Sequence, residues 1–210
     1  MRFWFALFGI LLMTNALNAQ SGRSDFFDQA DAFFQEYVTA EGGVYYQKLA
    51  ERSDALDELT TRIARADQNQ MSGSTLKAFY LNAYNILTIE QLVAHYPVKS
   101  PKDLDGFFDG MTHTVAGQSM TLDDLEKRTL YQQFPDARLH FALVCGAKGC
   151  PPLRDRAYQP DKLNEQLDKQ ARRAMADEDF IRVQPEERLV KASKIFQWYR
   201  DDFLAEASSI

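Results

Sequence analysis

Cysteine and histidine are scarce in this sequence, with two Cys and three His among 210 residues. They lack the spacing of a standard zinc site, so we expect no metal and no cofactor. Runs of like charge and internal repeats are also missing, and the formal net charge is −6. An acidic chain without a basic stretch has no electrostatic attraction to nucleic acid or to an anionic membrane. A small molecule or peptide remains the expected partner, and the oligomeric state stays open.

Long apolar stretches are confined to the N-terminus. A single cation, Arg2, precedes an uncharged apolar run over residues 3–13, and Ala19 follows a short polar segment. The run is shorter than the roughly 20 residues of a transmembrane helix and has the layout of a cleavable signal. We therefore predict a signal peptide over residues 1–19, one domain over residues 20–210, no stable membrane insertion after cleavage, and a periplasmic or secreted protein.

The remaining sequence has the composition of a globular domain, with 45% hydrophobic and 12% aromatic residues over the whole chain. A Thr121 and Asp124 pair three residues apart has the pattern of a capping box at the start of a helix. Apolar residues at helical spacing predict further helices over residues 24–38, 56–66, 75–95, 161–175 and 193–203.

Short strands are predicted between these helices. Residues 139–145 are apolar on both faces, which favours a central strand. A turn at Gly117 and Gln118 is expected in the first of two hairpins. The hairpin strands are predicted at residues 112–116, 119–122, 180–183 and 188–191. Together these elements predict an α+β fold, with several helices packed on a small, mostly antiparallel sheet.

Three stretches carry a family resemblance: AFYLNAYNILTI over residues 78–89, LHFALVCGAKGCPPL over residues 139–153, and SKIFQWYRDDF over residues 193–203. In this order they resemble the domain-of-unknown-function 547 family of uncharacterised, exported bacterial-type proteins. The resemblance extends from about Tyr45 to Phe203. It implies a shared fold and a shared site, without a known substrate. A distant likeness to papain-like or transglutaminase-like thiol enzymes is a further expectation.

Cys145 and Cys150 are the two cysteines, and they allow two interpretations. In an oxidising compartment an even number of cysteines favours a disulfide, which would stabilise so short a loop by about 2 kcal/mol. Alternatively, Cys145 is a nucleophile beside the loop from Gly146 to Gly149, with Lys148 lowering the pKa of its thiol. A bridged pair and a free thiol both remain open at this point.

His140 precedes the cysteines by five residues. On an unbent strand, His140 and Cys145 would point to opposite faces and lie roughly 16 Å apart, which argues against a direct pair. His140 therefore needs a partner from another element, such as Glu126, Asn82 or Asn85. A buried histidine bonded to backbone is the alternative for His140, and solvent exposure is the alternative for Glu126.

Asn82 and Asn85 are neighbours on one helix, in an otherwise apolar stretch that includes Tyr84. Buried amides need hydrogen-bond partners, so they either clamp the backbone of residues 139–145 or orient His140. We expect Asn82, Asn85 and His140 to form one buried polar cluster.

Two functions follow from these residues. We favour a noncatalytic domain that binds a small peptide or metabolite in a polar cleft near His140, with bridged cysteines and with contacts from Tyr84, Lys148 and the two asparagines. The alternative is a thiol-dependent hydrolase or acyl transferase, in which Cys145 attacks a carbonyl and His140 and Glu126 complete the catalytic group. A free Cys145 would favour the enzyme, and a disulfide would favour the binding domain.

Overall fold

The computed structural model describes residues 26–71, 73–146 and 149–206. The predicted signal peptide, residues 1–19, and Lys148 lie outside these ranges. Within the described part of the chain, no helix combines the length and the apolar character needed to cross a membrane.

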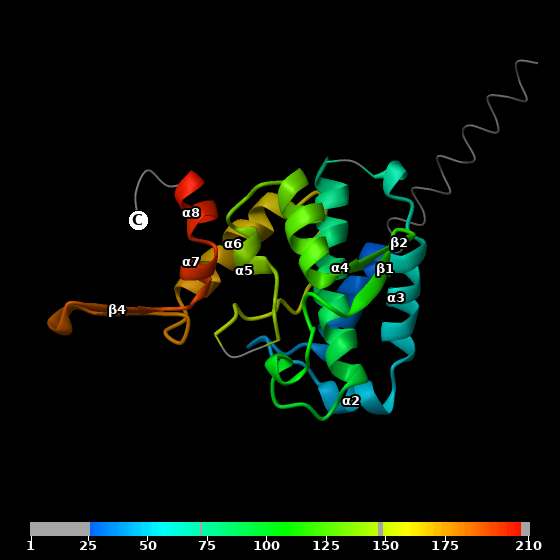
Figure 1. The fold of residues 1–210 in the computed structure, drawn as a ribbon, viewed down its shortest axis with the longest axis horizontal. Coiled ribbons are helices and arrows are strands. Elements are labelled where there is room, and N and C mark those ends of the chain that lie inside the picture. The colour runs from blue at the N-terminus through cyan, green and yellow to red at the C-terminus, as the bar shows by residue number, and fades with distance from the viewer. Residues whose placement is uncertain (1–25, 72, 147–148, 207–210) are drawn as a thin grey trace, which may run out of the picture.

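A long buried helix, α4 (Gly73–Ala94), organises the core. Its segment from residue 78 to residue 89 is buried at every position, because other helices cover it on several sides. Figure 1 shows α3 on one side of α4 and α5 and α6 on the other. Helices α2 (Tyr46–Glu51) and α3 (Asp54–Arg65) contact α4, and the N-terminal helix (residues 26–37) places the Phe26 ring against Phe79 of α4.

The first hairpin, β1 (Thr112–Val115) with β2 (Gln118–Thr121), is antiparallel as predicted. Its turn consists of Ala116 and Gly117, one residue earlier than predicted. Both have positive φ angles, 49° and 77°, as a type I′ turn requires. Their backbone N–H groups donate to carbonyl oxygens near the end of α3, so the turn also satisfies that helix terminus.

The second hairpin, β3 (Ile181–Gln184) with β4 (Leu189–Ala192), is also antiparallel and projects away from the helices (Figure 1). The described strands thus form two separate two-stranded sheets, and the α+β class is confirmed. Short 3₁₀ turns connect several elements, namely η1 (Gln68–Gln70), η2 (Pro101–Asp103) and η4 (Pro185–Glu187).

The predicted central strand over residues 139–145 is wrong. Leu139–Ala142 form one helical turn, α5, and the chain continues from Leu143 with extended backbone. Every residue of α5 is buried, and the Phe141 ring contacts the rings of Phe196 and Phe203 near the C-terminus. A short apolar run enclosed in this way has the same sequence pattern whether it is helix or strand.

The helices near the site are less regular than the core helices. The predicted capping box is present, because the Asp124 N–H donates to Thr121 Oγ1 at 3.1 Å and the Asp124 carboxylate accepts from Thr121. The helix then widens into a π-helix, η3, a form often found at functional sites. The bounds are η3 (Asp124–Tyr131), α6 (Leu163–Met175), α7 (Ile195–Trp198) and α8 (Arg200–Glu206).

Candidate functional site

Cys145 and Cys150 form a disulfide, as one of the two sequence interpretations predicted. Two cavities border the loop that it closes. The aromatic cleft has a volume of about 720 Å³, and its lining includes Tyr84, Phe108, Glu126, Cys145, Trp198 and Tyr199. The acidic cleft has a volume of about 740 Å³, and its lining includes Glu41, Val44, Asn85, Cys150, Asp177 and Asp179. Cys150 also reaches the aromatic cleft, so it lines both cavities.

A small recess of about 50 Å³ adjoins the aromatic cleft and shares five lining residues with it, among them Glu126 and Cys145. His140 also lines this recess. The three side chains predicted as catalytic, together with Tyr84, therefore meet at one place. They come from four segments, α4, η3, α5 and the start of the disulfide loop.

Glu126 is the buried acid of this site, with 6% of its surface exposed, so the solvent-exposed alternative is wrong. Its carboxylate accepts a 2.6 Å hydrogen bond from the Tyr199 hydroxyl and another hydrogen bond from Tyr84. Burial raises the pKa of Glu126 above its usual range. Burial and the nearby carboxylate raise the pKa of both tyrosines, which keeps them protonated as donors. A carboxyl group in this environment can hold a proton closer to neutral pH than an ordinary glutamate.

His140 is buried, and its imidazole pairs with Asp202 of α8, a residue that the sequence did not suggest. Its Nε2 lies 3.0 Å from Asp202 Oδ2. The ring stacks on Tyr199 with 3.8 Å between the ring centroids, and Tyr131 lies at 5.3 Å with nearly parallel planes. The carboxylate and the stacked rings fix the orientation of the imidazole.

Asn85 clamps the chain that leaves α5. Its Nδ2 donates to the Ala142 carbonyl at 3.0 Å, and its Oδ1 accepts from the Val144 N–H at 2.9 Å. Because Cys145 follows directly, this amide sets where the disulfide loop begins. The predicted clamp on residues 139–145 is therefore confirmed for Asn85.

Asn82 holds a different segment. Its Nδ2 donates to the Tyr158 carbonyl, and its Oδ1 accepts from the Tyr158 N–H, both at 2.9 Å. The predicted single cluster of Asn82, Asn85 and His140 is thus replaced by two backbone clamps and a separate His140–Asp202 pair.

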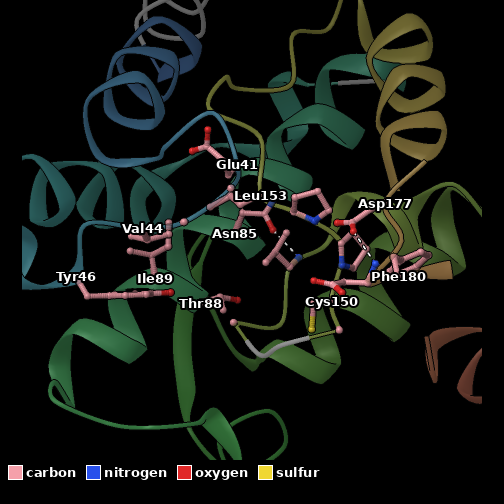
Figure 2. Close-up of a pocket in the computed structure, with 18 residues that line it drawn as sticks. Glu41, Val44, Tyr46, Asn85, Thr88, Ile89, Cys150, Leu153, Asp177 and Phe180 are labelled. Atoms are coloured by element: carbon pink, nitrogen blue, oxygen red, sulfur yellow. Dashed lines mark hydrogen bonds between the residues drawn. The ribbon is translucent and has the colours of Figure 1, made fainter. Parts of the chain in front are cut away.

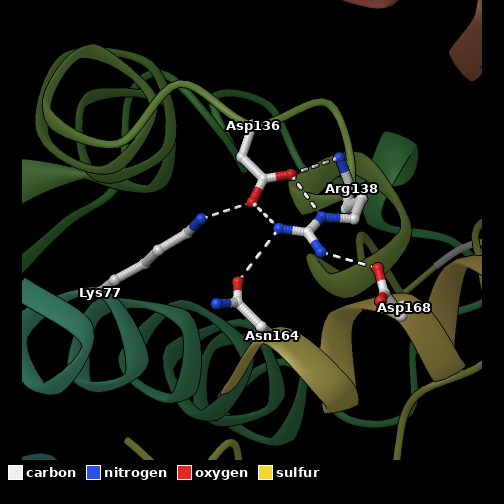
Figure 3. Close-up of polar contacts among 5 residues, drawn as sticks. All are labelled: Lys77, Asp136, Arg138, Asn164 and Asp168. Atoms are coloured by element: carbon white, nitrogen blue, oxygen red, sulfur yellow. Dashed lines mark hydrogen bonds and ion pairs between the residues drawn. The ribbon is translucent and has the colours of Figure 1, made fainter. Parts of the chain in front are cut away.

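An ionic network centred on the buried Asp136 fixes the approach to α5 (Figure 3). The Asp136 carboxylate accepts from Lys77 Nζ at 2.6 Å and from Arg138 Nε at 2.9 Å. Arg138 also donates to Asp168 at 2.7 Å and to Asn164 at 3.2 Å, which connects the segment to α6. Burial alone would raise the pKa of Asp136, but the hydrogen bonds from Arg138 and Lys77 lower it to about 2. The network thus holds the residues just before His140 between α4 and α6.

The acidic cleft is chemically different from the aromatic cleft. Figure 2 shows Val44, Ile89 and Leu153 along it, with Asn85 among them. Both polar atoms of that amide bind backbone, and Asp177 accepts from the N–H of a neighbouring residue. The buried Glu126 carboxyl, whose pKa is raised, and His140, which pairs with a carboxylate, lie at the recess, whereas the acidic cleft contains Tyr46, whose pKa burial raises to about 12.

Sequence reasoning missed Asp202, Tyr199 and Trp198. All three lie in the stretch SKIFQWYRDDF, which contributed to the family resemblance but contained no pattern that assigned these residues to a site. Among the described residues, no group of three or more His, Cys, Asp or Glu side chains could hold a metal ion.

The fold and the site together define a small α+β protein with an aromatic cleft beside a disulfide loop. Residues 68–173 match the family model described as "Protein of unknown function, DUF547", and the chain belongs to this family. No curated protein and no solved structure matches the chain. The distant likeness to papain-like enzymes therefore stays a prediction.

Proposed function

We propose that the aromatic cleft binds a small peptide or an amino-acid-like metabolite. The observation that carries this proposal is the convergence of Tyr84, Glu126, Cys145 and Trp198, from four segments, on one cavity of about 720 Å³. Small-ligand sites typically combine such a volume with apolar or aromatic walls and a few polar groups. A bridged Cys145 also favours binding over thiol catalysis in the oxidised protein.

The charges around the aromatic cleft support a zwitterionic ligand. Lys102 and Lys194 supply positive charge, while Asp109 and Asp123 supply negative charge. A short peptide or free amino acid carries one carboxylate and one ammonium group, so both ends can find opposite charges. Such complementarity selects partners more than it adds affinity.

An exposed aromatic surface and a buried acid complement these charges. Trp198 is 57% exposed and offers an apolar face to a side chain. At the rim of the recess, Glu126 accepts from Tyr199, and in its protonated form it can also donate to a ligand carbonyl. A peptide group is therefore the kind of polar centre that fits between Trp198 and the recess.

The same proposal includes a location outside the cytoplasm. The disulfide is compatible with an oxidising compartment, and residues 1–19 have the pattern of an export signal. Peptides and amino acids occur in such compartments, so the location agrees with the proposed ligand class.

The test uses the disulfide-intact protein and the dipeptide Ala-Phe in isothermal titration calorimetry. We expect Ala-Phe to bind, and its N-acetylated, C-amidated form to bind about tenfold more weakly because its charged ends are gone. Trp198→Ala should weaken binding, whereas Tyr45→Ala removes an aromatic ring that is 52% exposed and lies outside the cleft lining, and should not. Absence of binding by Ala-Phe, or equal binding to the wild type and Trp198→Ala, would contradict the proposal.

A further inference from the structure

We propose that Cys145 is a masked nucleophile: reduction of its disulfide with Cys150 turns the recess into a thiol hydrolase site served by His140 and Asp202. This goes beyond ligand binding, because it assigns an activity to a second redox form of the protein. It also has a test that requires no peptide.

The first support is the path of the chain between His140 and Cys145. The separation of roughly 16 Å expected for a straight strand does not apply, because the helical turn α5 rises only about 1.5 Å per residue. The backbone then extends from Leu143, and both His140 and Cys145 line the same recess of about 50 Å³.

The second support is that His140, which lines the same recess as Cys145, is paired with a carboxylate. Asp202 lies 3.0 Å from His140 Nε2, and the stacked Tyr199 ring limits rotation of the imidazole. Carboxylate, imidazole and thiol are the three groups of a nucleophilic triad. The recess is large enough for a water molecule, which occupies about 30 Å³ in the liquid, so a proton can pass between Cys145 and His140 through one water.

The third support is the accessibility of the disulfide. Cys145 and Cys150 are both only partly buried, and Cys150 lines both clefts, so a small dithiol can approach. Gly146 has a φ of +68°, and an added Cβ there would lie 2.6 Å from Leu92 Cδ1. The positive φ therefore favours glycine directly after Cys145, where the chain turns into the disulfide loop.

The reaction has two stages. A dithiol reduces the disulfide: it becomes a disulfide itself, and Cys145 and Cys150 each gain a hydrogen. The Cys145 thiol then passes its proton to His140, and the sulfur forms a bond to the carbonyl carbon of an ester or amide. The bond to the leaving group breaks, and His140 returns the proton to that group. Water hydrolyses the thioester, releases the acid and restores the thiol.

Two matched variants of the full chain separate the cysteines. Cys150→Ser leaves Cys145 permanently free, and Cys145→Ser leaves Cys150 free, so neither needs a reductant. With iodoacetamide at neutral pH, we expect Cys145 to be alkylated about tenfold faster than Cys150, since a nearby base increases the thiolate fraction. With p-nitrophenyl acetate, Cys150→Ser should release nitrophenol and carry an acetyl group on Cys145, identified by peptide mass.

Further variants test the two supporting residues in the Cys150→Ser background. His140→Gln should slow both reactions of Cys145 about tenfold. Asp202 acts as a positioning residue, so Asp202→Asn should slow them and Asp202→Glu should restore part of the rate, with the thermal midpoint unchanged between the two. Equal alkylation of the two cysteines, no acetyl adduct on Cys145, or rates that are insensitive to His140→Gln would each overturn the proposal.

The two proposals can fail separately. Dipeptide binding by the oxidised protein, together with an unreactive Cys145, would leave the binding function standing and reject the masked nucleophile. A reactive Cys145 without dipeptide binding would do the reverse.

Discussion

His140 and Asp202 are 62 residues apart in sequence, yet their Nε2 and Oδ2 atoms lie 3.0 Å apart. His140 belongs to the region that matches the family model, residues 68–173, whereas Asp202 lies beyond it in α8. The C-terminal helices therefore complete the surroundings of the recess, and Tyr199 contributes both a stacked ring and a hydrogen bond to Glu126.

This pairing predicts which double variants are nonadditive. His140→Ala should lower the free energy of unfolding by about 2 kcal/mol, because it removes a buried side chain and the partner of Asp202. Combined with Asp202→Ala, the loss should be smaller than the sum of the two single losses. Combined with Asn82→Ala, the losses should add, because that amide binds a different segment. Urea unfolding measures the free energy of unfolding of the single and double variants. Additive losses in both double variants would contradict a contact between His140 and Asp202.

The ionic network around Asp136 predicts a loss of stability in acid. The folded pKa of about 2 lies below the ordinary value of 3.8, so the stabilisation is fully present above about pH 4 and is lost as the pH falls towards 2. The shift corresponds to about 2 kcal/mol. Asp136→Asn should destabilise the protein by about 3 kcal/mol at neutral pH, because Lys77 and Arg138 lose their shared carboxylate, and it should flatten the acid dependence.

The matched control is Asp179→Asn, whose side chain is 96% exposed and whose effect should stay within about 0.5 kcal/mol. Urea unfolding between about pH 2 and pH 7 gives both curves. A parallel pH dependence in Asp136→Asn and the wild type would reject this role of the network.

The raised pKa of Glu126 predicts a pH dependence of stability opposite in sign to that of Asp136. The folded protein holds this proton more tightly than the unfolded chain, so ionisation of Glu126 lowers stability as the pH rises above its ordinary value of 4.5. Glu126→Gln keeps an acceptor for Tyr199 without a charge, so its stability at neutral pH should equal or exceed that of the wild type. Dipeptide binding should be retained in the same variant, because the glutamine amide can donate to the ligand carbonyl as protonated Glu126 does.

Glu165→Gln supplies the comparison, since the Glu165 side chain is 66% exposed. This variant should change neither the stability at neutral pH nor dipeptide binding. If Glu126→Gln is markedly less stable than Glu165→Gln at neutral pH, the buried carboxyl group is a net stabilising element and the interpretation of its raised pKa is wrong.

The sequence predicted most of the fold because the spacing of apolar residues agreed with the residues that cap helices and form turns. Both hairpins and the helices corresponding to α3, α4 and α6 lie close to their predicted bounds. The sequence did not predict α2, and the helix predicted over residues 193–203 is divided into α7 and α8. The segment around His140 was predicted wrongly, because enclosure on all sides removed the polar face that distinguishes a helix from a strand. The site was predicted only in part. The sequence identified candidate side chains such as His140, but a contact such as that of His140 with Asp202 depends on how segments distant in the sequence pack together.

Export is tested by the mass of the protein recovered from the cell envelope or the medium. We expect the intact mass to show loss of residues 1–19, because Arg2, the apolar run and Ala19 form a cleavable signal. Substituting Ala19 with a bulky residue should leave uncleaved precursor. Soluble cytoplasmic protein that retains Met1 would contradict the predicted location.

The last prediction concerns Asn85, which links the stability of the core to the position of Cys145. Asn85→Ala should lower the free energy of unfolding by about 2–3 kcal/mol, because the Ala142 carbonyl and the Val144 N–H lose their partner. Asn82→Ala is the matched control, since it removes a clamp of the same chemistry from the Tyr158 backbone.

The two variants should therefore differ in function more than in stability. In the Cys150→Ser background, Asn85→Ala should slow alkylation of Cys145, because the chain leading to the sulfur is no longer fixed beside His140. Asn82→Ala should leave that rate unchanged while it destabilises the protein. Equal alkylation rates in the two variants, at temperatures where both are folded, would mean that the clamp on residues 142–144 does not position the thiol and serves the packing of α5 alone.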